Sequence, residues 1–291
     1  MSLPTGSTPL VLAPIDDCCH VADGHPAWQE SCAFIWFDPE RSIAGYQHLY
    51  LRPADDRAVL WGWHLDATGV HESSGARATE RPRDDLTDLT VLGWRITSVD
   101  PLREYRSSAS YGATTALVAY RAQHEPSAFT VPDLASGLEQ HHYESVGRID
   151  GTYNDGAMTS PIVGVGFHDH SWGVRSRPSG GSLSHQFGFG ATADGHFVIS
   201  RTGRGDSSWN HSYVSNGATR EPIVDVTGLD QLHDEPTARV VLHTALGEHE
   251  LTGRRVLATT VPYGADYGAR CAFFAGTLGD AACYGMIELG G

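Results

Sequence analysis

Residues 59–65 read Val-Leu-Trp-Gly-Trp-His-Leu. Successive side chains of an extended strand point to opposite faces, so Trp61 and Trp63 share one face while Gly62 and His64 lie on the other. An alternation of this kind favours a β-strand over a helix. Because large side chains fall on both faces, the stretch predicts a strand with neither face open to solvent.

The same pattern continues along the chain, where short apolar runs rich in aromatic residues are separated by turns. Runs typical of strands cover residues 31–37, 43–51, 59–65, 89–99, 113–122, 141–153, 162–174, 184–191, 196–202, 223–226, 238–246, 254–261, 270–275 and 283–289. Asp155-Gly156 and Asp194-Gly195 are dipeptides typical of hairpin turns. Only residues 133–140 are expected to form a turn or two of helix. The chain is therefore predicted to be all-β, with strands spaced as in barrels or sandwiches.

Two prolines, Pro126 and Pro132, interrupt this pattern, and we expect a linker at residues 125–137. The linker predicts two β-domains of similar size, residues 1–136 and residues 137–291. A second irregular stretch, residues 71–88, is polar and charged. We expect it to form a surface loop or a lid.

The charge balance excludes several classes of protein. The 291 residues carry 20 basic side chains, all of them arginine, against 35 acidic ones, for a net charge of -15. Such a chain repels phosphate backbones, so no nucleic-acid partner is expected. No apolar run approaches the ~20 residues of a membrane span. The first basic residue is Arg41, which predicts that no signal peptide is present. Five cysteines without a Cys-x-x-Cys pair indicate reduced thiols, so a cytoplasmic protein is predicted.

Aromatic side chains are concentrated in the first third of the chain. Trp36, Tyr46 and Trp61 fall in adjacent predicted strands. They are expected to line a pocket for a large, poorly polar molecule. The alternative is that they only pack the core, where aromatic residues are common.

The densest chemistry lies in residues 164–175, Gly-Val-Gly-Phe-His-Asp-His-Ser-Trp-Gly-Val-Arg. On a strand, His168, His170 and Trp172 share one face, and Asp169 lies on the other. The glycines of the segment are typical of close backbone approach or of bulges.

Three interpretations of this cluster are open. The first is a buried, hydrogen-bonded cluster with a structural role. The second is a metal site of cupin type that uses His168 and His170, although the glutamate of the cupin pattern is missing. The third is acid/base chemistry in which Asp169 or a nearby acid handles the proton, His170 positions or deprotonates water, and Trp172 stabilises a developing cation.

Four further acids, Glu30, Glu144, Asp266 and Glu288, lie in apolar or glycine-rich sequence. Burial would raise the pKa of such a carboxyl and suit it to donate a proton. The alternative for each is an ordinary hydrogen-bonded or surface acid.

Residues 166–175, which end Asp-His-Ser-Trp-Gly-Val-Arg, resemble the signature of the AttH-like and carotenoid 1,2-hydratase (hydroxyneurosporene synthase) family. This family includes kievitone hydratase and Diels–Alderase relatives. Tyr143-Glu144 and the closing residues 285–288, Gly-Met-Ile-Glu, are similar to further strands of the family. The resemblance covers nearly the whole chain. It implies two tandem lipocalin-like β-barrel domains, no organic cofactor, and catalysis by an acid together with the His and Trp matched by His170 and Trp172.

The leading hypothesis is a cofactor-independent hydratase, dehydratase, isomerase or cyclase that acts on a terpenoid-, steroid- or polyketide-like molecule. Asp169, His170 and Trp172 are its expected catalytic residues, and His168 and Glu144 join the aromatic side chains in binding the substrate. No metal is expected. The alternatives are a non-catalytic carrier of lipids or isoprenoids and a metal-dependent enzyme of cupin type. The oligomeric state is not predicted.

Overall fold

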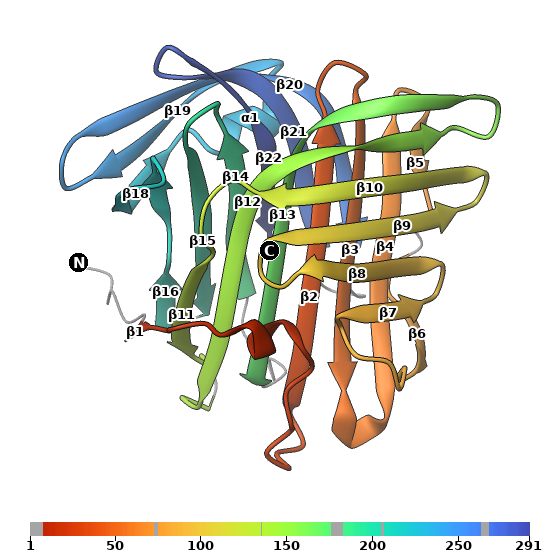
Figure 1. The fold of residues 1–291 in the computed structure, drawn as a ribbon. Helices are drawn as coiled ribbons and strands as arrows, with labels where there is room; N and C mark the ends of the chain where they lie inside the picture. The colour runs from red at the N-terminus through yellow and green to blue at the C-terminus, as the bar shows by residue number, and fades with distance from the viewer. Residues whose placement is uncertain (1–7, 73–74, 135, 176–182, 205–206, 263–267) are drawn as a thin grey trace. The chain divides into compact units, whose positions relative to one another are not determined.

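The computed structural model describes residues 8–72, 75–134, 136–175, 183–204, 207–262 and 268–291. In these residues the regular elements are strands, apart from α1 (Gln231–Asp234) and the two 3-10 turns η1 (Pro14–Asp17) and η2 (Pro53–Asp55) (Figure 1). The all-β prediction is confirmed. None of the helices in the described ranges is long and apolar enough to cross a membrane.

The first sheet is built around three long strands, β2 (Trp28–Asp38), β13 (Thr159–Val174) and β12 (Glu139–Asn154). Its strand order is β5-β4-β3-β2-β13-β12-β10-β9-β8-β7, with β11 and then β1 beside β12, and β6 beside β4. The other strands of this sheet are β1 (Thr8–Pro9), β3 (Ile43–Arg52), β4 (Arg57–Asp66), β5 (Gly69–His71), β6 (Arg77–Glu80), β7 (Asp88–Val91), β8 (Trp94–Asp100), β9 (Glu104–Tyr111), β10 (Thr114–Ala122) and β11 (Ser127–Pro132).

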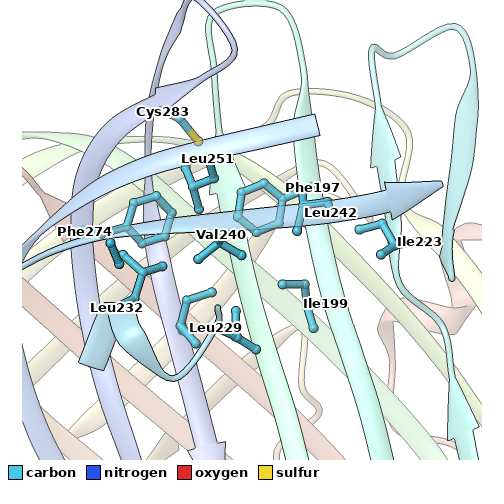
Figure 2. Close-up of a cluster of buried hydrophobic side chains, with 12 residues drawn as sticks. Phe197, Ile199, Ile223, Leu229, Leu232, Val240, Leu242, Leu251, Phe274 and Cys283 are labelled. Carbon is cyan, nitrogen blue, oxygen red and sulfur yellow. The ribbon is translucent and has the colours of Figure 1, made fainter. Parts of the chain in front are cut away.

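The second sheet has the strand order β14-β22-β21-β20-β19-β18-β17-β15-β16, and it closes into a barrel because β14 also pairs with β15. Its strands are β14 (Leu183–Ala191), β15 (His196–Arg204), β16 (Ser207–Asn210), β17 (Tyr213–Ser215), β18 (Arg220–Thr227), β19 (Thr237–Thr244), β20 (Glu248–Pro262), β21 (Gly268–Leu278) and β22 (Ala281–Gly290). Apolar side chains from most of these strands meet in one core cluster (Figure 2). In it the rings of Phe197 and Phe274 stack, and Leu232 brings α1 against the same cluster.

Two compact units divide the chain: one contains Thr8–Asp38 and Ala44–Ser179, the other Gly180–Gly291 with Pro39–Ile43. The division therefore falls some forty residues beyond the expected boundary at residue 136. The reason is strand pairing, since β12 and β13 are central strands of the first sheet. The expected linker at residues 125–137 contains β11, whose closing Pro132 stands at a strand end, where the missing N–H is tolerated.

Local differences from the predicted strands have simple causes. Residues 89–99 form two strands because Leu92 and Gly93 adopt positive φ angles and turn the chain between β7 and β8. Strand β9 was not among the predicted runs. In the described part of residues 133–140 a turn leads directly into β12 in place of a helix. The polar stretch at residues 71–88 contains β6, which pairs with β4.

The alternation of residues 59–65 is confirmed by the pairing of β4 with β3. Trp63 and Trp61 lie opposite Tyr46 and His48, so these four rings share one face. On the other face the Tyr111 hydroxyl lies only 2.0 Å from where a Cβ of Gly62 would stand. This contact brings β9 across the sheet against β4, so the sheet curls around its inner side chains.

Gly164→Ala tests the close approach of β13 to β2. A Cβ at Gly164 would lie 1.9 Å from the backbone oxygen of Phe37, and a backbone atom cannot turn aside as a side chain can. We expect the substitution to lower the free energy of unfolding by about 1–3 kcal/mol, as measured by urea denaturation. Gly203→Ala is the control, because the nearest atom there is the side-chain oxygen of Ser184 at 3.1 Å. If both variants lose the same free energy of unfolding, the close approach of β13 to β2 does not account for the loss in Gly164→Ala.

Candidate active site

An irregular segment between β1 and β2, residues 10–27, crosses the face of β12 and β13 (Figure 1). We call it the N-terminal strap. It carries Asp17 at the end of η1, where the carboxylate is 3% exposed. Asp17 accepts hydrogen bonds from the hydroxyls of Tyr143 (2.5 Å), Tyr105 (2.6 Å) and Ser98 (2.5 Å). Three hydroxyl groups from three strands therefore hold the strap to the sheet.

These contacts determine the ionisation state of the Asp17 carboxyl group. Burial alone would raise the pKa of Asp17, but the nearby His168 and the hydrogen bonds from Ser98, Tyr105 and Tyr143 lower it below its usual value. Burial and the Asp17 carboxylate raise the pKa of both tyrosines well above their usual range. Asp17 is therefore an anion held by two protonated phenols at neutral pH.

The second buried carboxylate is Glu30 of β2, which lies between two imidazoles. Its Oε1 atom is 2.5 Å from Nε2 of His170 and 2.9 Å from Nδ1 of His20. The backbone N–H of His20 donates to the other oxygen, at 3.1 Å. Glu30 and His170 are each 1% exposed, so this pair is closed off from bulk water.

Charge pairing outweighs burial at Glu30. Burial would raise its pKa, but the hydrogen bonds and charges of His170 and His20 lower it. For His20 the direction is reversed: burial would lower its pKa, while Glu30 and Asp16 raise it. The prediction that a buried Glu30 has a raised pKa is wrong, because two imidazoles stabilise the charged form.

Strand register explains why these groups meet. Cys32 lies directly opposite His170, and Glu30 directly opposite Trp172, in the antiparallel pair of β2 and β13. Glu30 is thus the diagonal neighbour of His170 on the same face, a separation that long side chains span. Tyr143 of β12 lies opposite His170 on its other side, with the two rings nearly perpendicular.

His168 lies two residues before His170 and on the same face. Its Nδ1–H donates to the backbone oxygen of Ala33 at 3.0 Å, so Nε2 carries no proton in the neutral ring. Burial lowers the pKa of His168, against the opposing effects of Asp17 and of the backbone oxygen of Ala33. The Tyr105 ring packs against it with a centroid distance of 4.1 Å.

These side chains surround a small cavity that has room for about one water molecule without movement of the walls. The walls combine polar side chains with two aliphatic ones. They are formed by Asp17, Cys32, Leu86, Ile96, Tyr105, Tyr143, His168 and His170.

The family model described as a domain of unknown function, DUF7064, matches residues 13–289. The chain belongs to the DUF7064 family. No curated protein matches it. Among solved structures, a putative AttH from Nitrosomonas europaea is similar with a TM-score of 0.61 at 13% identity, covering 92% of this chain and 93% of that one. Kievitone hydratase from Nectria haematococca gives a TM-score of 0.60 at 12% identity, over 99% and 96% of the two chains.

A third similar structure is CghA, solved with Sch210972, which has a TM-score of 0.52 at 13% identity and covers 99% of this DUF7064 chain and 97% of CghA. At such identities the likeness concerns the fold. The resemblance to the AttH-like family and the tandem lipocalin-like architecture are thereby confirmed.

The structure divides the expected catalytic residues of this DUF7064 protein between two faces of the sheet. His170 lies beside the cavity. Asp169 lies on the opposite face, where its Oδ1 accepts the backbone N–H of Ala33 at 2.8 Å. Glu144 pairs with Asp169 in the register and shares that opposite face. The acid nearest to His170 is therefore Glu30, with Asp17 across the cavity.

Trp172 shares the face of His170 but does not line the cavity. The His20 ring stacks on it at a centroid distance of 3.8 Å and an interplanar angle of 9°. Trp172 therefore fixes the plane of His20, which in turn donates to Glu30.

The predicted aromatic pocket residues do not meet around one site. Trp36 shares the face of His168, but its ring packs near His64 and Tyr153, further along the strands. Tyr46 stacks on Trp63, and Trp61 lies on the same opposite face. None of the three lines the cavity beside His170.

The pair of metal ligands in the alternative cupin-type interpretation, His168 and His170, is not the group that the structure brings together. In the described residues, the potential metal-binding group is His20, Glu30 and His170. Of the other acids, Glu288 lies in the barrel, with His185 at 2.6 Å, and Asp266 lies outside the described residues.

The sequence patterns missed Asp17, His20, Tyr105 and Tyr143. Asp17 and His20 lie in the strap, where the sequence has no strand-like or helical alternation that would predict which way a side chain points. Strand β9, which carries Tyr105, was not predicted. The remaining signal was the pair of adjacent acids, Asp16-Asp17, and such pairs are common in exposed loops.

A wider cavity lies in the barrel unit, at one end of β14 and β15, with about 960 Å³ of space that is partly open to solvent. Its walls include the Arg201–Asp225 ion pair, Trp209 and Leu289. His185 also lines it and lies 2.6 Å from the buried carboxylate of Glu288, but its side chain is 17% exposed, so this acid–imidazole pair is less enclosed than Glu30 and His170.

Asp17→Asn tests the anchoring of the strap. The amide leaves one or more buried hydroxyls poorly paired, and we expect it to lower the free energy of unfolding at neutral pH by about 2–3 kcal/mol. Because the pKa of Asp17 is lowered in the folded state, its stabilisation is present above the unfolded value, near 3.9, and is lost as the pH falls through the folded value. The variant should therefore lose less stability on acidification than the parent protein, as measured by urea denaturation at a series of pH values.

Asp66→Asn is the control for this variant, because Asp66 also accepts a tyrosine hydroxyl, from Tyr153, at a more exposed position. It should cost less than Asp17→Asn. A strap anchored by Asp17 is ruled out if the Asp17 variant unfolds like the parent protein at every pH.

Proposed function

We propose that this protein is an enzyme that adds water to, or removes water from, a carbon–carbon double bond of a hydrophobic molecule, or that isomerises or cyclises such a molecule by the same proton transfers. The observation that carries the proposal is the buried Glu30–His170 pair, 2.5 Å apart, beside an enclosed cavity. The fold it shares with kievitone hydratase supports a reaction of this type.

His170 acts as the acid and base of the reaction. The Glu30 carboxylate fixes the orientation of the imidazole, as a carboxylate does in a catalytic triad. With Nε2 bonded to Glu30, the ring exchanges its catalytic proton through Nδ1. It protonates the alkene in hydration, and the ring, now neutral, takes up the proton that is released when water adds to the cation; dehydration reverses both transfers.

Asp17 stabilises the charge that develops on the substrate. Protonation of an alkene produces a carbocation, and an anion in a closed, weakly polar cavity attracts that charge more strongly than it would in water. Tyr105 and Tyr143 hold the Asp17 carboxylate in place and keep it ionised. The space for about one water beside these groups suits the reacting water.

The hydrophobic substrate is inferred from the apolar part of the wall. Leu86 and Ile96 line the cavity together with the polar groups, and the phenol rings add apolar surface. The cavity is too small for such a molecule in this structure, so the strap must move when the substrate enters. This movement must break the hydrogen bonds of Asp17 and the packing of Leu10, Leu12 and Ala22 against the aromatic cluster of the sheet.

The test is turnover of three probe alkenes, farnesol, geranylgeraniol and a prenylated phenol, in water labelled with oxygen-18. We expect at least one to yield a product heavier by one labelled water, or an isomer that carries solvent deuterium when deuterium oxide replaces the labelled water. His170→Ala and Glu30→Gln should lower this rate by at least about 100-fold, as measured by mass spectrometry.

His71→Ala is the matched control, because His71 also pairs with a carboxylate, Asp66 at 2.9 Å, away from the cavity. Its rate should equal that of the parent protein. Full turnover by a folded His170→Ala protein would remove His170 from the mechanism, and stoichiometric retention of an unchanged probe would favour the carrier function.

A further inference from the structure

We propose that His20, Glu30 and His170 also form a site for a divalent transition-metal ion, with zinc as the best fit, and that the bound ion blocks the acid/base pair. The binding itself is independent of the proposed function. Only the block rests on it, because a block presupposes that His170 transfers protons.

The donor set matches zinc. Two imidazole nitrogens and one carboxylate oxygen form a known set of three protein ligands, with the fourth position left to water. The donor atoms of His20, Glu30 and His170 all lie within 4.8 Å of one another. Imidazole ligands also favour zinc over magnesium or calcium, which prefer oxygen.

Only a small rearrangement is needed. Neighbouring ligands of a tetrahedral zinc ion are ~3.3 Å apart, given bonds of ~2.0 Å. In this structure Glu30 Oε1 lies 2.5 Å from His170 Nε2 and 2.9 Å from His20 Nδ1. The ion would replace the two shared protons while the carboxylate withdraws and the two imidazole nitrogens, which lie no more than 4.8 Å apart, move to a separation of ~3.3 Å.

Neighbouring side chains fix the orientation of the His20 ring, as is common for metal-binding imidazoles. Its second nitrogen, Nε2, faces Oδ1 of Asp16 at 3.4 Å, and a carboxylate in that position orients many metal-binding imidazoles. Its ring also stacks flat on Trp172. Glu30 and His170 are buried, so the site is enclosed on the side of the sheet.

Metal binding would have two consequences. It would occupy Nε2 of His170 and remove Glu30 as its partner, so the ring could no longer be protonated and deprotonated in turnover. It would also tie the strap, which carries His20, to β2 and β13, which carry the other two ligands. Both effects oppose substrate entry and proton transfer.

The experiment is a titration of the chelator-treated full-length protein with cobalt(II), whose visible absorption reports tetrahedral coordination, followed by displacement with zinc. We expect saturation at a single equivalent. Asp16→Ala should weaken zinc binding by about 10-fold, and His20→Ala should abolish the cobalt spectrum. His71→Ala, in which another carboxylate-paired imidazole is removed, should bind as the parent protein does.

A missing tetrahedral cobalt spectrum, or the same spectrum in the parent protein and His20→Ala, would overturn the site. Asp16→Ala keeps the test decisive if His20→Ala does not fold, because unchanged zinc affinity in that variant contradicts the proposed geometry. Zinc should also abolish turnover of any probe alkene that the metal-free protein converts. Cobalt binding without any turnover would leave the metal site standing and count against the proposed function alone.

Discussion

The burial of Glu30 is the constraint on which the rest of the first unit depends. A carboxylate that is 1% exposed is stable only if charged or strongly polar partners replace its water. Two histidines do so, one from β13 and one from the strap. The pair therefore requires one register between β2 and β13, and it requires the strap to lie across the sheet. The contacts that pair this buried carboxylate therefore fix the strand register and, at the same time, the geometry of the site.

Asp17 is a second buried carboxylate whose water is replaced by protein groups. Here hydroxyls of β8, β9 and β12 replace the water, and they fix the strap at a second point. The two carboxylates lie on the same side of the sheet as His168 and His170, and both are ionised because of their partners. A chain with a net charge of -15 thus buries two of its negative charges, and hydroxyl groups and imidazoles rather than arginine pair with them.

Strands and faces could be predicted from the sequence because alternation is a local property. The faces of residues 59–65 and the shared face of His168, His170 and Trp172 follow from the period of an extended chain, and the register confirms them. The unit boundary could not be predicted from Pro126 and Pro132. Prolines at the ends of a strand interrupt the apolar alternation of the sequence, and a linker between domains interrupts it in the same way. The partners of His170 could not be predicted either. Glu30 is 140 residues away, and His20 lies in a segment without any period.

That distance along the chain has a consequence for biosynthesis. During translation, β2 emerges with Glu30 long before β12 and β13 exist, so one edge of an apolar strand remains without its final neighbour while more than a hundred residues are made. Long-range antiparallel pairing of this kind is slow to form. The nascent chain must therefore be shielded from pairing with other chains until residue 174 has left the ribosome. Expression at low temperature or with abundant chaperones should favour soluble protein for this reason, whatever its substrate.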